Sequence, residues 1–290
     1  MSERGPAKRT PWYLAGRRWV QIVSLLAVNA SFFYQARYIC FPVLNCWACP
    51  IAAVACPLGA LQTAIVDMRA LLILPLYILG SMLAVSAVFG RMMCGWLCPF
   101  GLMQEWLGKV NPRQRHVPPV AAYGKYLALV ALALIAPYFL GYPLFCKLCP
   151  QGFLEGGIPQ PLLHPELRAL IGGWWYAKLA ILAGTAVAVV FYKRAFCHAV
   201  CPLGAIFSLV NRISLVRMHY DRDACTDCMW CVRQCPQGID PRSQLGSHAC
   251  VLCMRCAGCP FGAIGVSTAF SRPRACACDA GGRADEGGCS

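Results

Sequence analysis

The sequence predicts a mainly α-helical membrane protein, in which four transmembrane helices form two internal repeats and a small cysteine-rich domain follows them. Of the 290 residues, 58% are hydrophobic and 13% are charged, which is too apolar for an ordinary soluble domain. Four long apolar segments occur, and the 21 cysteines recur in spaced groups. We therefore divide the chain into an N-terminal tail (1–18), two membrane repeats (19–118 and 119–216), the cysteine-rich domain (217–270) and a tail expected to be disordered (271–290).

Each apolar segment is long enough to cross a membrane, because roughly 20 apolar residues in a helix span a hydrocarbon core of about 30 Å. The segments cover residues 19–40, 70–91, 122–143 and 171–192. Basic residues concentrate before the first segment and between the second and third. By the positive-inside rule, we expect a multi-pass protein of a bacterial inner (cytoplasmic) membrane with both termini in the cytoplasm. This clustering by loop explains the net charge of +14 without a nucleic-acid partner.

The cysteine-rich domain begins with Cys225, Cys228, Cys231 and Cys235, the last followed by Pro236. This spacing is that of the bacterial two-cluster ferredoxin signature, in which three close cysteines hold one iron–sulfur cluster and the fourth reaches the other. Zinc is the alternative, but structural zinc sites use two separated ligand pairs. The signature therefore predicts a bacterial-type ferredoxin-like domain with two [4Fe-4S] clusters.

The second half of this domain repeats the pattern with one residue fewer before its last cysteine. Exchange of the fourth ligand between the halves gives the expected ligand sets. One cluster takes Cys225, Cys228, Cys231 and Cys259, and the other takes Cys250, Cys253, Cys256 and Cys235.

Four further cysteine pairs, each with proline directly after its second cysteine, lie near the ends of the apolar segments: Cys46/Cys49, Cys94/Cys98, Cys146/Cys149 and Cys197/Cys201. The first and third pairs are 100 residues apart, and the second and fourth are 103 apart. Since alternate segments end on the same side of a membrane, the first and third pairs are expected outside and the other two inside. We expect two further [4Fe-4S] clusters, an outer one bound by Cys46, Cys49, Cys146 and Cys149 and an inner one bound by Cys94, Cys98, Cys197 and Cys201.

Two alternatives apply to these membrane pairs. Cysteine is a common buried residue, so the pairs can be inert thiols. The outer pairs also fit a thiol–disulfide relay, because C-x2-C pairs perform redox exchange. In addition, Cys56 is itself followed by proline and can replace one outer ligand.

The apolar stretches 102–110 and 203–213, which follow the inner pairs, are expected to be helices whose N-terminal amides face the cysteines. Glu105 is expected to extend its side chain to a membrane interface.

The motifs CGWLCP at 94–99 and CHAVCP at 197–202, together with the ferredoxin-type array, resemble those of the NapH-, MauN- and NosR-type membrane ferredoxin-like proteins. The resemblance covers roughly residues 20–265 and implies [4Fe-4S] clusters, a membrane location and electron transfer with quinol or a periplasmic redox partner. The extra outer pairs at Cys46 and Cys146 indicate a sister group of the nitrate-reductase member.

The expected function is electron transfer that links quinone or a cytoplasmic donor to a periplasmic redox enzyme, with other redox subunits as partners. The chain would then be a quinol-dehydrogenase-like subunit of an oxidoreductase system. The alternatives are a MauN-like redox factor that matures a periplasmic metalloenzyme or protein-derived cofactor, the thiol–disulfide relay, and a membrane redox sensor. No C-x-x-C-H haem motif and no glycine-rich nucleotide fingerprint occurs in the sequence.

Overall fold

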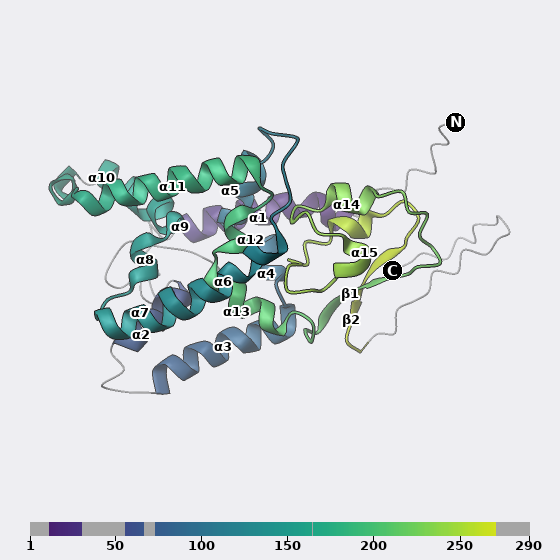
Figure 1. Cartoon of the computed structure of the whole chain (residues 1–290), viewed down its shortest axis with the longest axis horizontal. Helices are drawn as coiled ribbons and strands as arrows, with labels where there is room; N and C mark the ends of the chain where they lie inside the picture. Colours follow the sequence, from purple (N-terminus) through teal and green to yellow (C-terminus); the bar gives the residue numbers. More distant parts are fainter. Residues whose placement is uncertain (1–11, 31–55, 67–72, 164, 271–290) are drawn as a thin grey trace.

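The protein is represented by a computed structural model, which describes residues 12–30, 56–66, 73–163 and 165–270. A body of helices occupies one end of the molecule and the small cysteine-rich domain occupies the other (Figure 1). The predicted outer pair Cys46/Cys49 and the tail after residue 270 lie outside the described residues.

Four long helices form the frame of the body. Three of them are α1 (Trp12–Ala30), α3 (Ile73–Phe89) and α11 (Gly173–Phe191). The fourth is the continuous helix Val120–Leu140. It is made up of most of η2 (Pro119–Tyr123) followed by α6 (Gly124–Leu127), the π-helical η3 (Ala128–Ile135) and α7 (Ala136–Leu140). The last three long helices coincide with predicted apolar segments, because uninterrupted apolar runs of this length are stable as helices. The first helix begins before the predicted segment, whose residues 31–40 lie outside the described part of the chain.

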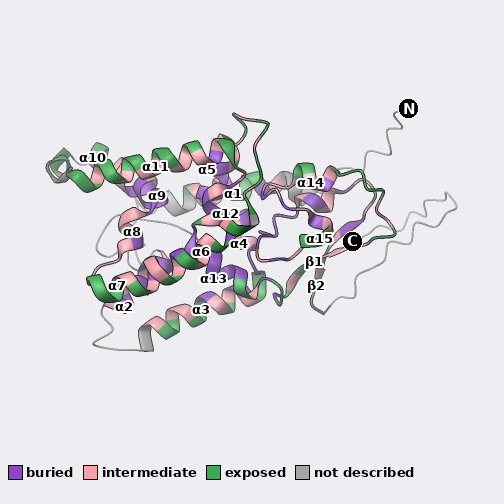
Figure 2. Cartoon of the chain, in the orientation of Figure 1, coloured by how far each residue is buried: buried purple, intermediate pink, exposed green. Residues whose placement is uncertain are grey.

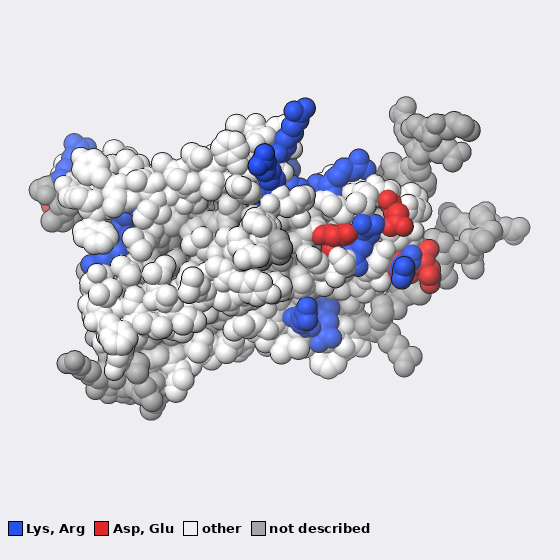
Figure 3. Space-filling model, viewed as in Figure 1, with Lys and Arg blue, Asp and Glu red and all other residues white. Residues whose placement is uncertain are grey.

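Two of these helices, Val120–Leu140 and Gly173–Phe191, are long and apolar enough to cross a membrane, whereas α3 is shorter. Their large apolar side chains are left uncovered: Phe139 is 79% exposed and Val187 is 58% exposed. In the view of Figure 3, charged side chains gather at the cysteine-rich end and at the far end, and the body between them is nearly free of charge. An apolar surface of this extent fits lipid better than water, so it indicates a membrane protein.

A cysteine–proline turn starts four short helices of the body. The proline occupies the first helical position, where its fixed φ angle and missing N–H cost nothing. The preceding cysteines Cys98, Cys149 and Cys201 share one extended backbone conformation, with φ of −67° or −68° and ψ between 110° and 117°. The four helices are α2 (Pro57–Val66), α5 (Pro99–Leu107), α9 (Pro150–Gly152) and α13 (Pro202–Val210). The predicted helices at 102–110 and 203–213 thus begin earlier, at their prolines.

Short helices connect these elements. Two of them, α4 (Met92–Trp96) and α12 (Ala195–Ala199), precede the cysteine–proline turns of α5 and α13, and the remaining ones are α8 (Leu144–Leu148), η4 (Phe153–Gly157), α10 (Pro159–Leu163) and η5 (Pro165–Leu170). Buried residues concentrate where α4, α5, α12 and α13 meet (Figure 2). Phe100 and Phe207 are fully buried in this core, and Phe100 packs edge-on against Phe196. Cys98 and Cys201 belong to the same core, and Cys94 packs against it.

The cysteine-rich domain is closed by an antiparallel pair of strands, β1 (Val216–Tyr220) and β2 (Ile264–Thr268), with Val216 opposite Thr268. Between the strands lie α14 (Trp230–Gln234), α15 (Pro241–Gln244) and η6 (Arg255–Gly258). Both halves contain the same uncommon backbone feature, a pair of left-handed residues around a cysteine: Asp227 and Met229 in the first half, Leu252 and Met254 in the second. The internal two-fold pattern of the sequence is therefore also a pattern of backbone conformation.

Candidate functional site

The inner set, Cys94, Cys98, Cys197 and Cys201, comes together at the start of α5 and α13 although its two pairs are about 100 residues apart in the chain. Cys98, Cys197 and Cys201 are at most 6% exposed. Burial raises the pKa of Cys201, and the proximity of Cys197, Cys94 and Cys98 raises it further. Burial raises the pKa of Cys94 and Cys98 as well, so these thiols resist ionisation unless cations neutralise them, and iron supplies that charge.

Hydrogen-bond donors already point at these sulfurs. The amide of Gly204, in the first turn of α13, donates to Cys201 Sγ over 3.4 Å. Gln104 Nε2, from α5, donates to Cys197 Sγ over 3.0 Å. Amides at a helix start and neutral side-chain donors both stabilise anionic sulfur, so this arrangement fits a thiolate-bound cluster.

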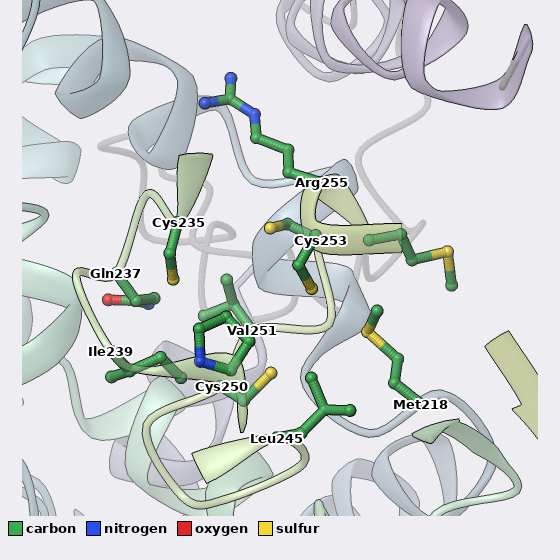
Figure 4. Close-up of a pocket in the computed structure, with 12 residues that line it drawn as sticks. Met218, Cys235, Gln237, Ile239, Leu245, Cys250, Val251, Cys253 and Arg255 are labelled. Atoms are coloured by element: carbon green, nitrogen blue, oxygen red, sulfur yellow. The ribbon is translucent and has the colours of Figure 1, made fainter. Parts of the chain in front are cut away.

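The second set lies in the cysteine-rich domain. Cys235, Cys250, Cys253 and Cys256 line one cavity together with apolar side chains such as Ile239. Figure 4 shows Cys235, Cys250 and Cys253 around this cavity. Burial raises the pKa of Cys235 to about 11, with Cys253 as the next contribution. The structure therefore places Cys235 of the first half with the three cysteines of the second half, as the exchange of ligands requires.

The third set, Cys225, Cys228, Cys231 and Cys259, lies closer to the surface. Burial raises the pKa of Cys231, and Cys259 is near enough to contribute to the rise. Cys225 interacts with Tyr220 at the end of β1, and Cys228 is exposed. This set is thus more open to solvent than the second set, in which Cys250, Cys253 and Cys256 are buried.

The outer set is described in part. Gln62 Nε2, from α2, is 3.5 Å from Cys146 Sγ, and Gln62 Oε1 accepts from the amide of Phe145 over 3.1 Å. A Cβ built on Gly59 would lie 3.6 Å from both Cys146 Sγ and Cys56 Cβ, so these two cysteines are neighbours. Cys149 is buried in the same core.

The glutamines reveal a correspondence that cysteine spacing does not show. Gln62 lies five residues after the proline of Cys56-Pro57, and Gln104 lies five residues after the proline that follows Cys98. Each glutamine donates to the first cysteine of the opposing pair. Cys56 is therefore the structural counterpart of Cys98. The matching strings PLGALQ and PFGLMQ carried this signal in the sequence.

The inner set and the second set adjoin through their loops. Trp96 Nε1 donates to the carbonyl of Leu252 over 3.3 Å. A Cβ on Gly95 would lie 2.6 Å from the carbonyl oxygen of Val251 and 3.3 Å from Cys253 Cα, which is too close for any side chain. Glycine at this position is thus what allows the two cysteine loops to touch.

Asn211, directly after α13, also links the body to the cysteine-rich domain. Its Oδ1 accepts from the amide of Arg91 over 2.9 Å, and its Nδ2 donates to the carbonyls of Ser247 and Cys250 over 2.7 and 3.0 Å. Arg91 Nη1 also donates to the carbonyl of His248 over 2.6 Å. The domain is therefore held on the body by buried polar contacts as well as by packing.

Two buried arginines stand between the inner and second sets. Arg91 opposes the burial that raises the pKa of Cys94 and of Cys250, and Arg194 is in electrostatic range of Cys197 and Cys253. Arg91 Nε and Arg194 Nε and Nη1 are buried and have no hydrogen-bond partner among the described residues. Buried hydrogen-bond donors require acceptors. The sulfurs of an anionic iron–sulfur cluster are negatively charged acceptors, which suits the positively charged guanidinium groups.

Glu105 lies at the centre of this cationic region. Its carboxylate forms ion pairs with Arg17 (2.5 Å), Arg194 and Arg255 (2.7 Å), which come from α1, the end of α11 and the cysteine-rich domain. Burial alone would raise the pKa of Glu105, but attraction to the three arginines outweighs it and lowers the pKa to about 2. The expectation that Glu105 extends to a membrane interface was wrong, because its three partners are distant in sequence and meet it only in the fold.

The arrangement also bears on the zinc alternative. Within the described ranges, no three Cys, His, Asp or Glu side chains converge on the position of a single metal ion. Structural zinc needs four ligands around one ion, whereas the cysteines of a [4Fe-4S] cluster bind different irons and stand apart. The ferredoxin-type spacing of Cys225, Cys228, Cys231 and Cys235 is what favours clusters over zinc.

The comparisons with known proteins agree with this chemistry. The family described as "4Fe-4S binding domain" matches residues 70–118, 125–158 and 174–220. This match contains the pairs at Cys94, Cys146 and Cys197 and ends before Cys225. No solved structure is significantly similar to the chain.

Three curated relatives illustrate the similarity. An uncharacterized protein of Methanocaldococcus jannaschii is 28% identical over 65% of this chain and 76% of its own length. The methylamine utilization ferredoxin-type protein MauN of Methylorubrum extorquens is 29% identical over 57% of this chain and 55% of its own. The regulatory protein NosR of Pseudomonas aeruginosa is 28% identical over 62% of this chain but only 25% of its own. The predicted resemblance is thereby confirmed: the chain is similar to MauN- and NosR-type proteins, and three of its stretches match a 4Fe-4S binding family of iron–sulfur electron-transport proteins.

Proposed function

We propose that the protein is a membrane electron carrier in which four [4Fe-4S] clusters form a path from the cytoplasmic domain into the membrane part. The observation that carries this proposal is the contact between Gly95 and the Val251–Cys253 loop, which brings the inner cysteine set against the second set. Clusters bound to touching loops exchange electrons without a diffusing carrier.

The geometry described above supports three of the proposed ligand sets. In the cysteine-rich domain, one cluster takes Cys225, Cys228, Cys231 and Cys259, and the next takes Cys235, Cys250, Cys253 and Cys256. The inner cluster takes Cys94, Cys98, Cys197 and Cys201. The family match supports iron–sulfur binding at the membrane pairs, and the cysteine spacing supports it in the ferredoxin-like domain.

For the outer cluster, we replace one of the ligands expected from spacing alone. Cys56 joins Cys146 and Cys149, and one of Cys46 and Cys49 completes the set. This assignment is supported by the shared glutamine position, since Gln62 donates to Cys146 as Gln104 donates to Cys197.

The orientation we propose is multi-pass, with four spans in two repeats and both termini in the cytoplasm. It rests on the distribution of basic residues in the sequence, which places the α4–α5 end inside and the α8–α9 end outside. Reporter fusions after Pro112 and after Pro161 should therefore give opposite signals. Identical signals from the two fusions would overturn both this orientation and the separation into inner and outer clusters.

The proposed path links a quinone pool or a cytoplasmic donor to a redox enzyme on the periplasmic side of a bacterial inner membrane. A second candidate, a redox factor that matures such an enzyme, is favoured by the similarity to the methylamine utilization protein MauN. Both functions use the same cluster path. The electron carrier would pass electrons to its enzyme in every catalytic cycle, whereas the maturation factor would supply them only while the enzyme is assembled.

Iron content tests the path directly. Protein purified without oxygen should contain about 16 iron atoms and as much acid-labile sulfide per chain for four clusters, and quinol should reduce the clusters seen by EPR. If the protein contains only about 8 iron atoms and its membrane cysteines form disulfides, the proposed cluster path is wrong and a thiol–disulfide relay takes its place. Reduction by quinol without sustained turnover against a periplasmic acceptor would favour the maturation factor.

A further inference from the structure

A cleft of about 190 Å³ opens between the end of α5, the end of α11 and the ferredoxin-like domain. Six cationic side chains line it: Arg18, Lys109, Lys193, Arg194, Arg233 and Arg255. They come from four different segments of the chain, so the cleft is a product of the docked domain.

The cleft has an excess of positive charge. Glu105 is the single acidic residue among its lining residues, and its carboxylate is already shared by three arginines. Lys109, Lys193 and Arg233 form no ion pair with any described residue. Gathering like charges around one concave space is unfavourable unless an anion occupies it.

The chemistry of the lining selects the class of anion. Guanidinium groups match the geometry of phosphate oxygens, and lysines add point charge. The cleft lies at the end of the candidate span Gly173–Phe191, and Trp106 on its wall is 51% exposed. Tryptophan is typical of membrane interfaces, and basic pockets at span ends bind anionic headgroups.

We propose that this cleft binds the phosphate group of an anionic phospholipid headgroup or of a free phosphate ion. The proposal goes beyond electron transfer and gives it a link to the membrane surface, and its redox consequence rests on the proposed function. Cys235 lines both this cleft and the cavity of the second cysteine set. A phosphate held there places negative charge beside that cluster and lowers its reduction potential.

Calorimetric titration of the detergent-solubilised holoprotein tests the site. Short-chain phosphatidylglycerol should bind, whereas zwitterionic phosphatidylcholine should not. A Lys109→Gln/Lys193→Gln variant should bind phosphatidylglycerol at least about tenfold more weakly, because each basic residue contributes on the order of fivefold. An Arg113→Gln/Arg212→Gln variant removes the same charge from exposed positions outside the cleft and should bind like wild type.

Inorganic phosphate at constant ionic strength identifies the source of the anion. Binding of both probes, lost in the Lys109/Lys193 variant, assigns a general phosphate site, and binding of phosphatidylglycerol alone assigns a lipid site. Equal binding by wild type and this variant, or no binding of either probe, overturns the proposal. Iron content and EPR of the same samples report separately on the clusters, so a failure of the cleft is distinguishable from a failure of the electron path.

Discussion

Replacement of Cys201 by alanine is expected to remove the inner cluster completely, with the loss of about four iron atoms per chain and of electron transfer to the outer side. Cys98→Ala should remove the same EPR signal, because both cysteines bind one cluster across the two halves. The double variant should cost little more than either single variant, since the first change already destroys the shared site. The two clusters of the ferredoxin-like domain should remain.

Cys289→Ala is the matched control, because the same atom is removed from a cysteine that the sequence places in the tail beyond the cluster motifs. Its iron content should equal that of wild type. If Cys98→Ala and Cys201→Ala deplete different EPR signals, the pairing across the halves is wrong and each pair must act alone.

Glu105→Gln is expected to destabilise the attachment of the ferredoxin-like domain strongly. The change keeps the shape of the side chain and leaves Arg17, Arg194 and Arg255 without their common carboxylate. Removing one partner from a buried ion-pair network typically costs about 3 kcal/mol or more in unfolding free energy, because the remaining charges are buried and uncompensated. Denaturant unfolding of the solubilised protein, followed through the iron–sulfur absorbance, measures this cost.

Glu166→Gln provides the comparison at the surface. Glu166 is exposed and forms no ion pair within the described part of the chain, so its change should stay within about 0.5 kcal/mol of wild type. Equal stability of Glu105→Gln and Glu166→Gln would show that the three-arginine network does not hold the domain.

Local chemistry explains why the sequence predicted so much. Cluster ligation in ferredoxins uses close cysteines, so the spacing of Cys225, Cys228 and Cys231 is visible along the chain. Membrane helices are visible for the same reason, since each requires one continuous apolar run. The helices α3, Val120–Leu140 and α11 accordingly lie where the apolar segments predicted them.

Contacts between residues far apart in the chain could not be predicted from the spacing of the motifs. Gln104 meets Cys197 across 93 residues, and Glu105 meets Arg255 across 150. Neither Gln104 nor Glu105 is part of a cysteine motif, so each looks in the sequence like an ordinary polar residue of a short helix. The sequence leaves Cys56 as an alternative outer ligand, and only the fold places it beside Cys146.

The cysteine spacing, the apolar segments and the proline-started helices depend on residues close together in the chain, so all three can be identified from the sequence alone. The tertiary structure decided which cysteine groups adjoin and which charges face them. Gly95 admits the Val251–Cys253 loop, and Arg91 and Arg194 stand between the two cysteine sets. Contact and charge compensation act over a few ångströms in space, and only folding brings residues more than 100 positions apart within that range.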